Sequence, residues 1–457
     1  MGVCGQQLGF ARTDSNCFAG GHTRCFALPV RQLCGRRGVC RLSIVTFVVA
    51  LMTVTSCGSV TPSPPAPVPT EAGYRDFSFG TVTTESPSGE KPESKLWWND
   101  GSWWGSLYND QAQAFHIYRL DVATQRWVDT GTVLDDRSDS KADVLWDEAN
   151  QKLYVASHIF VASGVPTPSS ASWGRLYRLT YSAGAKTYTL DAGFPVDVTR
   201  GKAETLTIAK DSFGRLWVTY VESGNVMINR SMSSDADWGE PFVLPLSPAV
   251  ATVSTDDISA AMAFQADKVG VMWSNQLNSK FYFAVHQDGD ADTVWQPEET
   301  PMPDSACTGA CADDHINLKT DAAGRIFAAV KTSLSTSDSP LVMLLVRGQG
   351  GGWSSYIYSQ VRDRDTRPLV LLDEQQGRIH VFTGSTEAGG EIRYKSTNVS
   401  NIQFAPGTGQ IFIRSNRDVN INNPTATKQN LNGTTGLVVL ASDYVTRFYW
   451  HNYLNLR

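Results

Sequence analysis

The hydrophobic pattern of this chain repeats a short phrase, in which a polar turn that usually contains glycine precedes an apolar or aromatic run. The phrase recurs about seven times at a spacing of roughly 50–63 residues, a period typical of repeat architectures. The runs are centred near Trp104, Tyr154, Trp217, Met272, Phe327, His380 and Val438. The turn residues tolerate positive φ, and the runs fit a pleated, half-buried surface. One such unit cannot bury its own face, whereas several arranged radially can, so the pattern predicts an all-β chain folded as a β-propeller.

Each repeat is expected to form a blade of four antiparallel strands. In the third repeat these strands are predicted at residues 204–211, 215–222, 225–232 and 238–246. Large aromatic residues begin or occupy the outermost strands, where they are expected to fill the gap between blades. They are Trp127, Trp238, Trp295 and Trp353.

The last repeat is one strand short, while an isolated strand pattern, residues 75–82, precedes the first blade. We infer that this segment completes the last of seven blades as its outer strand, which would remove an exposed sheet edge. The alternative is a propeller of six blades with the last unit as an appendage.

Composition supports the all-β prediction and limits the classes of partner that we expect. Of 457 residues, 41% are hydrophobic and 10% aromatic, and long amphipathic helical patterns are almost lacking. The net charge is -6, and no basic run stands out after the N-terminal segment, so a nucleic-acid partner is not expected. We expect a monomer.

The N-terminal segment has the pattern of a targeting signal. Arg36, Arg37 and Arg41 precede an apolar stretch, residues 42–54, that is short for a membrane span. The stretch leads into Val-Thr-Ser-Cys57, which resembles a bacterial lipobox. The resemblance implies cleavage before Cys57 and its lipidation, hence an exported protein anchored to the membrane at the cell surface or in the periplasm. An ordinary secretory signal or an uncleaved anchor are the alternatives.

The predicted organisation has three parts. Residues 1–57 form an N-terminal extension with the signal, residues 58–74 a Pro/Ser/Thr-rich tether, and residues 75–457 the propeller. Only two of the eight cysteines, Cys307 and Cys311, lie in the folded part. A local disulfide is favoured in an exported protein, because a zinc site would have only the acidic residues and the histidine at 313–315 as further nearby ligands.

Candidate chemistry gathers in the loops that lead into the inner strands, because these loops converge at one mouth of the central channel. Every blade places ionisable or amide side chains there. They are Glu93 and Lys95; Lys141 and Asp143; Lys202 and Glu204; Asp256 and Asp257; Asp313, Asp314 and His315; Asp365, Thr366 and Arg367; Asn422, Asn423, Thr425 and Lys428.

Two interpretations of this mouth stay open. One is a structural ion network, since charges near a channel need partners; its basic and acidic members would be Lys141, Arg367 and Lys428 with Glu204, Asp257 and Asp314. The other is a ligand or metal site. Its binding residues would be Lys95, Lys141, Asp143, Glu204, Asp256, Asp257, Asp314, His315, Arg367 and Lys428. Oxygen ligands would suit Ca²⁺, the one cofactor considered, and Glu204, Asp257 and Asp314 are the candidates for acid–base catalysis.

Other noticeable residues are expected to be structural. His158, His286 and His380 lie in or next to strand patterns. The cluster of Trp97, Trp98, Trp103 and Trp104 is predicted to be core, with sugar stacking as the alternative. No Walker loop, HExxH helix, GxSxG elbow or dinucleotide fingerprint is present.

The phrases KDSFGRLWVTY and TDAAGRIFAAVKTS resemble the sialidase-like (BNR) propeller superfamily in its broad sense. Longer strings, such as ADDHINLKTDAAGRIFAAVKTS, are similar to an uncharacterised group of exported bacterial propellers, over nearly everything from Arg75 onward. The resemblance implies the fold and a surface location. It does not extend to sialidase catalysis, because the Asp-box is lacking and only Arg367 occupies a position comparable to that of an arginine of the sialidase triad.

Three functional hypotheses follow. The first is a surface lipoprotein that binds a glycan or another extracellular polymer at the channel mouth. The second is a glycoside hydrolase or lyase that uses the carboxylates of the mouth, and the third is a protein-interaction platform.

Overall fold

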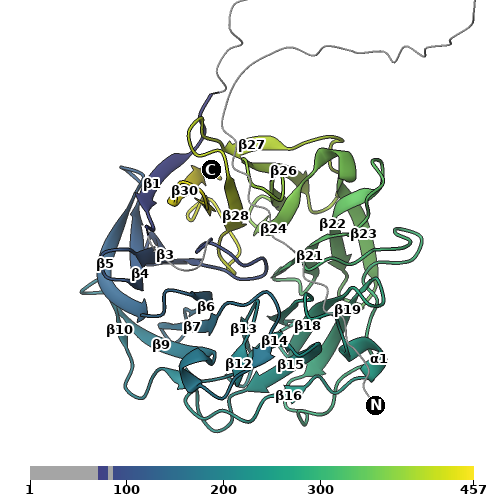
Figure 1. Cartoon of the computed structure of the whole chain (residues 1–457), viewed down its shortest axis with the longest axis horizontal. Helices are drawn as coiled ribbons and strands as arrows, with labels where there is room; N and C mark the ends of the chain where they lie inside the picture. Colours follow the sequence, from purple (N-terminus) through teal and green to yellow (C-terminus); the bar gives the residue numbers. More distant parts are fainter. Residues whose placement is uncertain (1–69, 81–85) are drawn as a thin grey trace, which may run out of the picture. The chain divides into compact units, whose positions relative to one another are not determined.

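The computed structural model of this chain describes residues 70–80 and 86–457 and confirms the predicted fold. Seven antiparallel sheets are arranged as blades around a central channel (Figure 1). The targeting segment with Cys57, and the tether up to residue 69, lie outside the described residues. Within the described part, no helix has both the length and the apolar character needed to cross a membrane.

The first three blades follow the predicted strand order from the centre outward. Blade 1 comprises β2 (Leu96–Asn99), β3 (Ser102–Asn109), β4 (Ala114–Asp121) and β5 (Arg126–Asp135). Blade 2 comprises β6 (Ser140–Asp147), β7 (Lys152–Ile159), β9 (Arg175–Ser182) and β10 (Thr187–Leu190), with β11 (Val196–Asp197) also paired to β9. Blade 3 comprises β13 (Thr207–Lys210), β14 (Leu216–Glu222), β15 (Asn225–Arg230) and β16 (Phe242–Val243).

Blade 4 is a three-stranded sheet, and the next two blades have four strands each. Blade 4 comprises β17 (Ser259–Phe264), β18 (Lys268–Asn275) and β19 (Lys280–Gln287). Blade 5 comprises β20 (Ile316–Thr320), β21 (Ile326–Lys331), β22 (Pro340–Arg347) and β23 (Trp353–Gln360). Blade 6 comprises β24 (Thr366–Asp373), β25 (Arg378–Gly384), β26 (Ile392–Asn398) and β27 (Gln410–Ile413). A short pair, β8 (Val165–Pro166) with β12 (Gly201–Lys202), and the helix α1 (Pro248–Ala251) lie in connections.

Blade 7 is built from both ends of the described chain. β28 (Ile421–Thr425), β29 (Leu437–Asp443) and β30 (Phe448–Leu454) are completed by β1 (Tyr74–Ser78), which pairs antiparallel with β30 (Figure 1). Arg75 fixes this closure, because its Nε donates to Oδ2 of the buried Asp418 at 2.5 Å and its guanidinium lies 3.3 Å from the Phe448 ring centroid. The inferred closure by the N-terminal strand is confirmed, and the six-bladed alternative is wrong.

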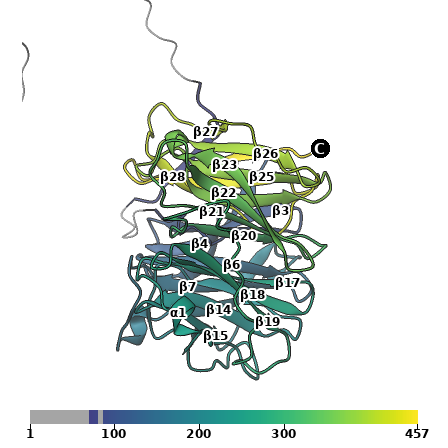
Figure 2. The ribbon, with the colours of Figure 1, turned by 90° about the vertical axis from the view of Figure 1, so that its right-hand side faces the viewer.

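The tryptophans pack the blades together. Trp97, Trp103 and Trp104 are at most 1% exposed, so they are core residues and do not offer faces for sugar stacking. Trp127 of blade 1 meets His451 of blade 7 edge to face, and Trp353 of blade 5 meets Phe283 of blade 4 in the same way. These outer-strand aromatics fill the space between neighbouring blades, as expected. The ring of sheets is seen edge-on in Figure 2.

Candidate functional site at the channel mouth

The channel mouth is plugged by the loop that leads into β2, residues 86–95. Lys91 carries the plug: its Nζ lies 2.5 Å from Oδ2 of Asp314, bonds to Oε1 of Glu204, and is 3.6 Å from Glu90. A single ammonium group, only 6% exposed, therefore joins blade 3 to blade 5. Because Lys91 is one of several lysines in such loops, its position in the sequence gave no sign of this role.

The ion network exists, but the pairs differ from those expected. Lys141 bonds to Glu90 at 2.5 Å, Arg367 to Glu387 at 2.6 Å and Lys428 to Asp143 at 2.8 Å. Glu204, Asp257 and Asp314 are therefore not their partners. The prediction was wrong because Asp143 was considered only as a binding residue, Glu90 was not picked out within its loop, and Glu387 lies in the loop after β25, which the sequence pattern did not single out.

A lower layer of this network is structural. Lys95 donates to Glu93 and to the carbonyl of Ala142, both at 2.6 Å, and His158 lies 2.7 Å from the other oxygen of Glu93. Burial acts to raise the pKa of Glu93, but Lys95 and His158 outweigh it and hold the pKa at about 2. Since these side chains are at most 2% exposed, they tie blades 1 and 2 together and are closed to a ligand.

Of the two aspartates that precede β17, the structure brings Asp256 to the site. The carboxylate of Asp257 accepts backbone N–H bonds from Ser254 at 2.8 Å and Gln276 at 3.0 Å, so it stabilises its own loop. One carboxylate oxygen each of Asp256, Glu204 and Asp314 lie within 4.8 Å of one another. Adjacent loop residues point in different directions, a distinction that the sequence does not reveal.

Glu204 and Asp314 share one cation but differ in acidity. Burial raises the pKa of Glu204 to about 7 despite the opposing charge of Lys91, and its Oε2 has no hydrogen-bond partner among the described residues. Burial also acts on Asp314, but His315 and Lys91 hold the pKa of that carboxyl well below its usual range. Neighbouring carboxyls whose pKa values are pushed apart in this way are an arrangement that general acid–base chemistry uses.

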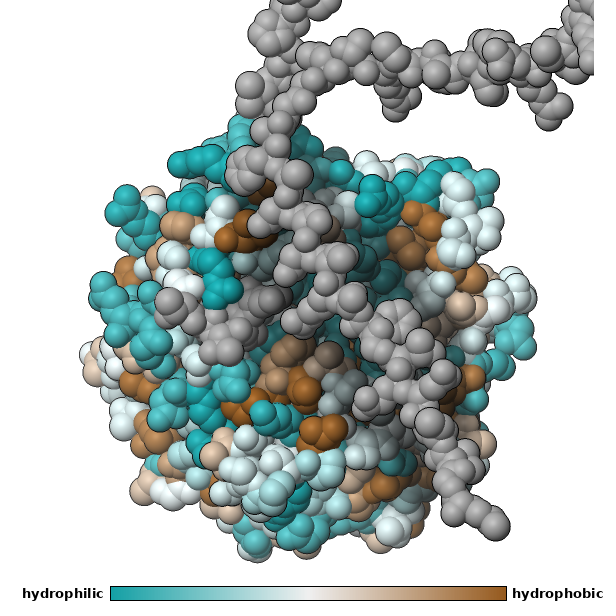
Figure 3. All heavy atoms as spheres, in the orientation of Figure 1, coloured by the Kyte–Doolittle hydropathy of each residue, from teal (hydrophilic) through white to brown (hydrophobic). Residues whose placement is uncertain are grey.

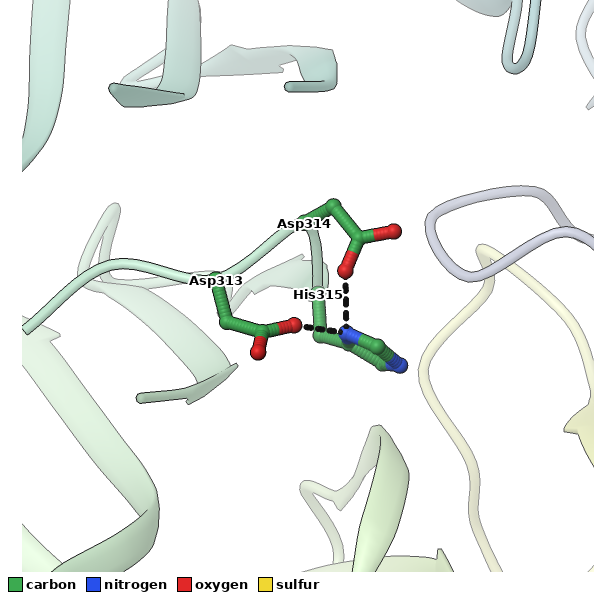
Figure 4. Close-up of side chains that lie close together, drawn as sticks. All are labelled: Asp313, Asp314 and His315. Atoms are coloured by element: carbon green, nitrogen blue, oxygen red, sulfur yellow. Dashed lines mark hydrogen bonds and ion pairs between the residues drawn. The ribbon is translucent and has the colours of Figure 1, made fainter. Parts of the chain in front are cut away.

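His315 lies between two carboxylates (Figure 4). Its Nδ1 is 2.5 Å from Oδ1 of Asp313 and 2.8 Å from Oδ1 of Asp314, and the side chain is 4% exposed. Burial lowers the pKa of His315, but Asp314 and Asp313 outweigh it and raise the pKa above its ordinary value. Nε2 lies 3.4 Å from Oγ1 of Thr366 on β24.

Among the residues that the structure describes, two groups of side chains have the donor atoms for a metal ion, and both include Asp314. They are Asp313, Asp314 and His315, and Glu204, Asp256 and Asp314. Their oxygen-rich donors suit Ca²⁺. However, Lys91 already bonds to Glu204 and Asp314, so an ion would have to displace its ammonium group from these carboxylates. We assign no metal to the site.

A hollow of about 510 Å³ opens beside His315 between blades 5 and 6, and we call it the rim hollow. Its charged lining consists of Asp313, Lys331, Arg364, Asp365 and Glu387. Lys331 Nζ lies 2.8 Å from Glu387 and 3.2 Å from Asp313. Sequence reasoning missed Lys331 and Glu387 because it followed only the loops into the inner strands, whereas the loops after the second strands reach the same mouth.

Asp365 lies in the wall of the rim hollow, but its side chain is fully buried beside the hydroxyls of Ser359 and Thr383. Burial raises the pKa of Asp365 to about 6, and hydrogen bonds from Ser359 and Thr383 oppose this rise. Asp365 therefore belongs to the packed wall, and the residues that face the hollow are its other charged neighbours.

Two strained residues aim neighbouring side chains at the site. Arg367 (φ 49°) and Asn423 (φ 53°) both precede a proline, where the backbone is normally extended. In each case the register of the inner strand shifts, in β24 and in β28, as at a β-bulge. Arg367 and the adjacent Asn422 both bond to Glu387. In the sequence, these two bulges correspond to the strings TRPL and NNPT, in each of which a proline follows the strained residue.

Comparison with known proteins identifies structures with a similar fold but does not assign this chain to a family. No family model and no curated protein sequence matches this chain. Among solved structures, a polysaccharide lyase described as PL25 ulvan lyase matches with a TM-score of 0.54 and 11% identity, over 84% of this chain and 96% of its own. The same kind of lyase bound to -[GlcA(1-4)Rha3S]- matches with a TM-score of 0.50 and the same identity and coverage. These likenesses are to lyase propellers, and the sialidase-like resemblance gains no support from them.

Proposed function

We propose that this protein binds a polysaccharide that carries acidic groups, and that the rim hollow holds it. The observation that carries the proposal is the charged lining of the rim hollow, where Lys331 lies between the carboxylates of Asp313 and Glu387. Sugar hydroxyls would donate to Asp313 and Glu387, while Lys331 and Arg364 would face the acidic groups. Glu387 is 56% exposed, so exchanging its ion pairs for ligand contacts costs little.

The comparisons show only a shared fold. Since fold alone does not determine function, they give weak support for a saccharide ligand. A propeller of this shape accommodates -[GlcA(1-4)Rha3S]- in the lyase complex. The residues of the rim hollow carry the argument for this chain. We propose as well that the protein is exported and anchored through Cys57; labelling with a palmitate analogue, abolished in Cys57→Ala, tests the anchor.

The binding test uses a panel of neutral and acidic polysaccharides in affinity electrophoresis and calorimetry. Lys331→Met removes the cation of the hollow but keeps a side chain of similar length, and Lys186→Met, at an exposed lysine outside the hollow, is the matched control. We expect at least one acidic polysaccharide to bind the wild type and to bind Lys331→Met about tenfold more weakly. Absence of binding across the panel, or equal affinity in Lys331→Met, would overturn the proposal.

Cleavage of the bound polysaccharide is the second candidate function, and the unequal acidity of Glu204 and Asp314 favours it. A glycosidic bond is broken by an acid and a base held near each other. Substrate would have to displace Lys91 from this pair. Release of reducing ends, or of ultraviolet-absorbing unsaturated products, should then be lost in Asp314→Asn; a wild type that binds without any turnover would leave the protein a binding module.

A further inference from the structure

A second polar cavity lies within the channel itself. It measures about 180 Å³ and is bounded by Pro92 and Ser94 of the plug loop and by the inner strands of blades 3, 4 and 5. It shares Lys210, Ala263 and Thr320 with a larger hollow of about 680 Å³, which is lined by the turns between first and second strands. The channel therefore opens at the end opposite the rim hollow. Figure 3 shows one face of the molecule, on which hydrophilic and apolar side chains are interspersed where it is not drawn in grey.

Three lysines line this channel cavity: Lys210 pairs with Asp147 at 2.5 Å, whereas Lys319 and Lys428 connect blades that are not neighbours. Lys319 of blade 5 is 3% exposed and donates to the carbonyl of Thr427 in blade 7. Lys428 of blade 7 reaches Asp143 of blade 2 at 2.8 Å. Lys319 forms no ion pair with any described residue, so its buried amine has only a neutral acceptor.

The nearby carboxylates already accept hydrogen bonds from other groups. Asp143 accepts backbone N–H bonds from Ser94 at 2.8 Å and Ile208 at 2.9 Å in addition to Lys428. At the wide end, Asp211 and Asp321 each accept a backbone N–H bond within their own turns. Lys428, 23% exposed, already pairs with Asp143, so the buried amine of Lys319 lacks a carboxylate of its own among the described residues, although a buried ammonium group requires a negative partner.

We propose that the channel cavity binds a small oxyanion, a carboxylate, sulfate or phosphate group, between Lys319 and Lys428, and that the anion enters from the turn-lined end. This site is separate from the rim hollow and does not depend on the proposed function. Burial lowers the pKa of Lys319 to about 7, and the positive charge of Lys428 adds to this while Asp143 opposes it. An anion beside the amine favours its charged form, so binding at pH 8 should take up a proton.

The test measures thermal unfolding and calorimetric binding with sodium sulfate, phosphate and acetate, against sodium chloride at equal ionic strength. An anion that binds only the folded protein raises its melting temperature. We expect sulfate or phosphate to stabilise the wild type beyond chloride, and the affinity to fall at least tenfold in Lys319→Met. Lys186→Met, at an exposed lysine outside both cavities, is the matched control and should bind as the wild type does. Glucuronate is included to distinguish the acidic group of a larger molecule from a free inorganic ion.

A second measurement keeps the test decisive if Lys319→Met does not fold. The wild type is acetylated with limiting reagent, and peptides containing Lys319 and Lys186 are quantified by mass spectrometry. Bound sulfate should slow acetylation of Lys319 several-fold and leave that of Lys186 unchanged. Equal rates at Lys319 with and without each anion, or stabilisation no greater than that by chloride, would overturn the proposal.

Discussion

Replacement of Glu204 by glutamine should change how the stability of the protein depends on pH. In the folded protein, burial raises the pKa of Glu204 from its ordinary value of 4.5 to about 7. Between these values the folded protein holds a proton that the unfolded chain has lost, so the free energy of unfolding falls as the pH rises. The difference corresponds to about 3 kcal/mol by pH 8.

Two neighbours do not obscure this effect. The pKa of Asp314 is held far below its usual range, so this group is ionised in both states between pH 5 and 8 and contributes no slope there. His315, whose pKa is raised, stabilises the folded protein at low pH and loses that contribution as the pH rises. It is present in both proteins, and its contribution drops out of their difference.

The assay is urea unfolding of the wild type and Glu204→Gln at intervals from pH 4.5 to 8. We expect the variant to gain about 3 kcal/mol relative to the wild type across this range. Glu148→Gln, on an exposed turn, is the control and should keep a constant difference from the wild type. A difference between Glu204→Gln and the wild type that is constant with pH, or that moves in the opposite direction, would refute the reasoning.

Three further substitutions test the framework around the site. Lys91→Met removes the cation shared by Glu204 and Asp314 and should cost about 3 kcal/mol of unfolding free energy at pH 8, and less at pH 5. Lys91→Arg should recover most of this loss. Equal losses at both pH values would contradict the assigned pairing. Arg75→Ala breaks the bond that closes blade 7 and should cost about 2 kcal/mol in the same unfolding assay; an unchanged midpoint would show that strand pairing alone closes the ring. Cys307 and Cys311 are joined by a disulfide across a short loop, so serine at both positions should cost about 2 kcal/mol by loop entropy, and reductant should lower the melting temperature of the wild type but not of the double variant.

The fold could be predicted because its signals are local. The polar turn and the apolar run of each repeat adjoin in sequence, and each phrase marks the second strand of a blade, as in DSFGRLWVTYV for β14. The ring closure was also readable, because a spare strand at residues 75–82 and a missing strand at the C-terminus are complementary. Burial of the tryptophans followed from the same pattern.

The site was only partly predictable, because its pairings depend on distance in space. Asp314, His315 and Glu204 were identified correctly as residues of one mouth, since each precedes or begins an inner strand. The sequence could not show that Lys91 bonds to two of them from another blade, nor that Asp256 faces them while Asp257 turns away. These outcomes depend on side-chain direction within loops, which hydrophobic periodicity does not encode.

The strand that closes blade 7 also sets the order in which this protein can be completed. β1 begins at Tyr74 and its partner β30 ends at Leu454, so the pairing joins segments that lie on either side of the other six blades in the sequence, and β30 is synthesised long after β1. Contacts between such distant segments form slowly, because a long loop must close first. While translation is in progress, the growing chain therefore contains an unpaired N-terminal strand, and a nonsense mutation anywhere before Phe448 would leave that strand without its partner.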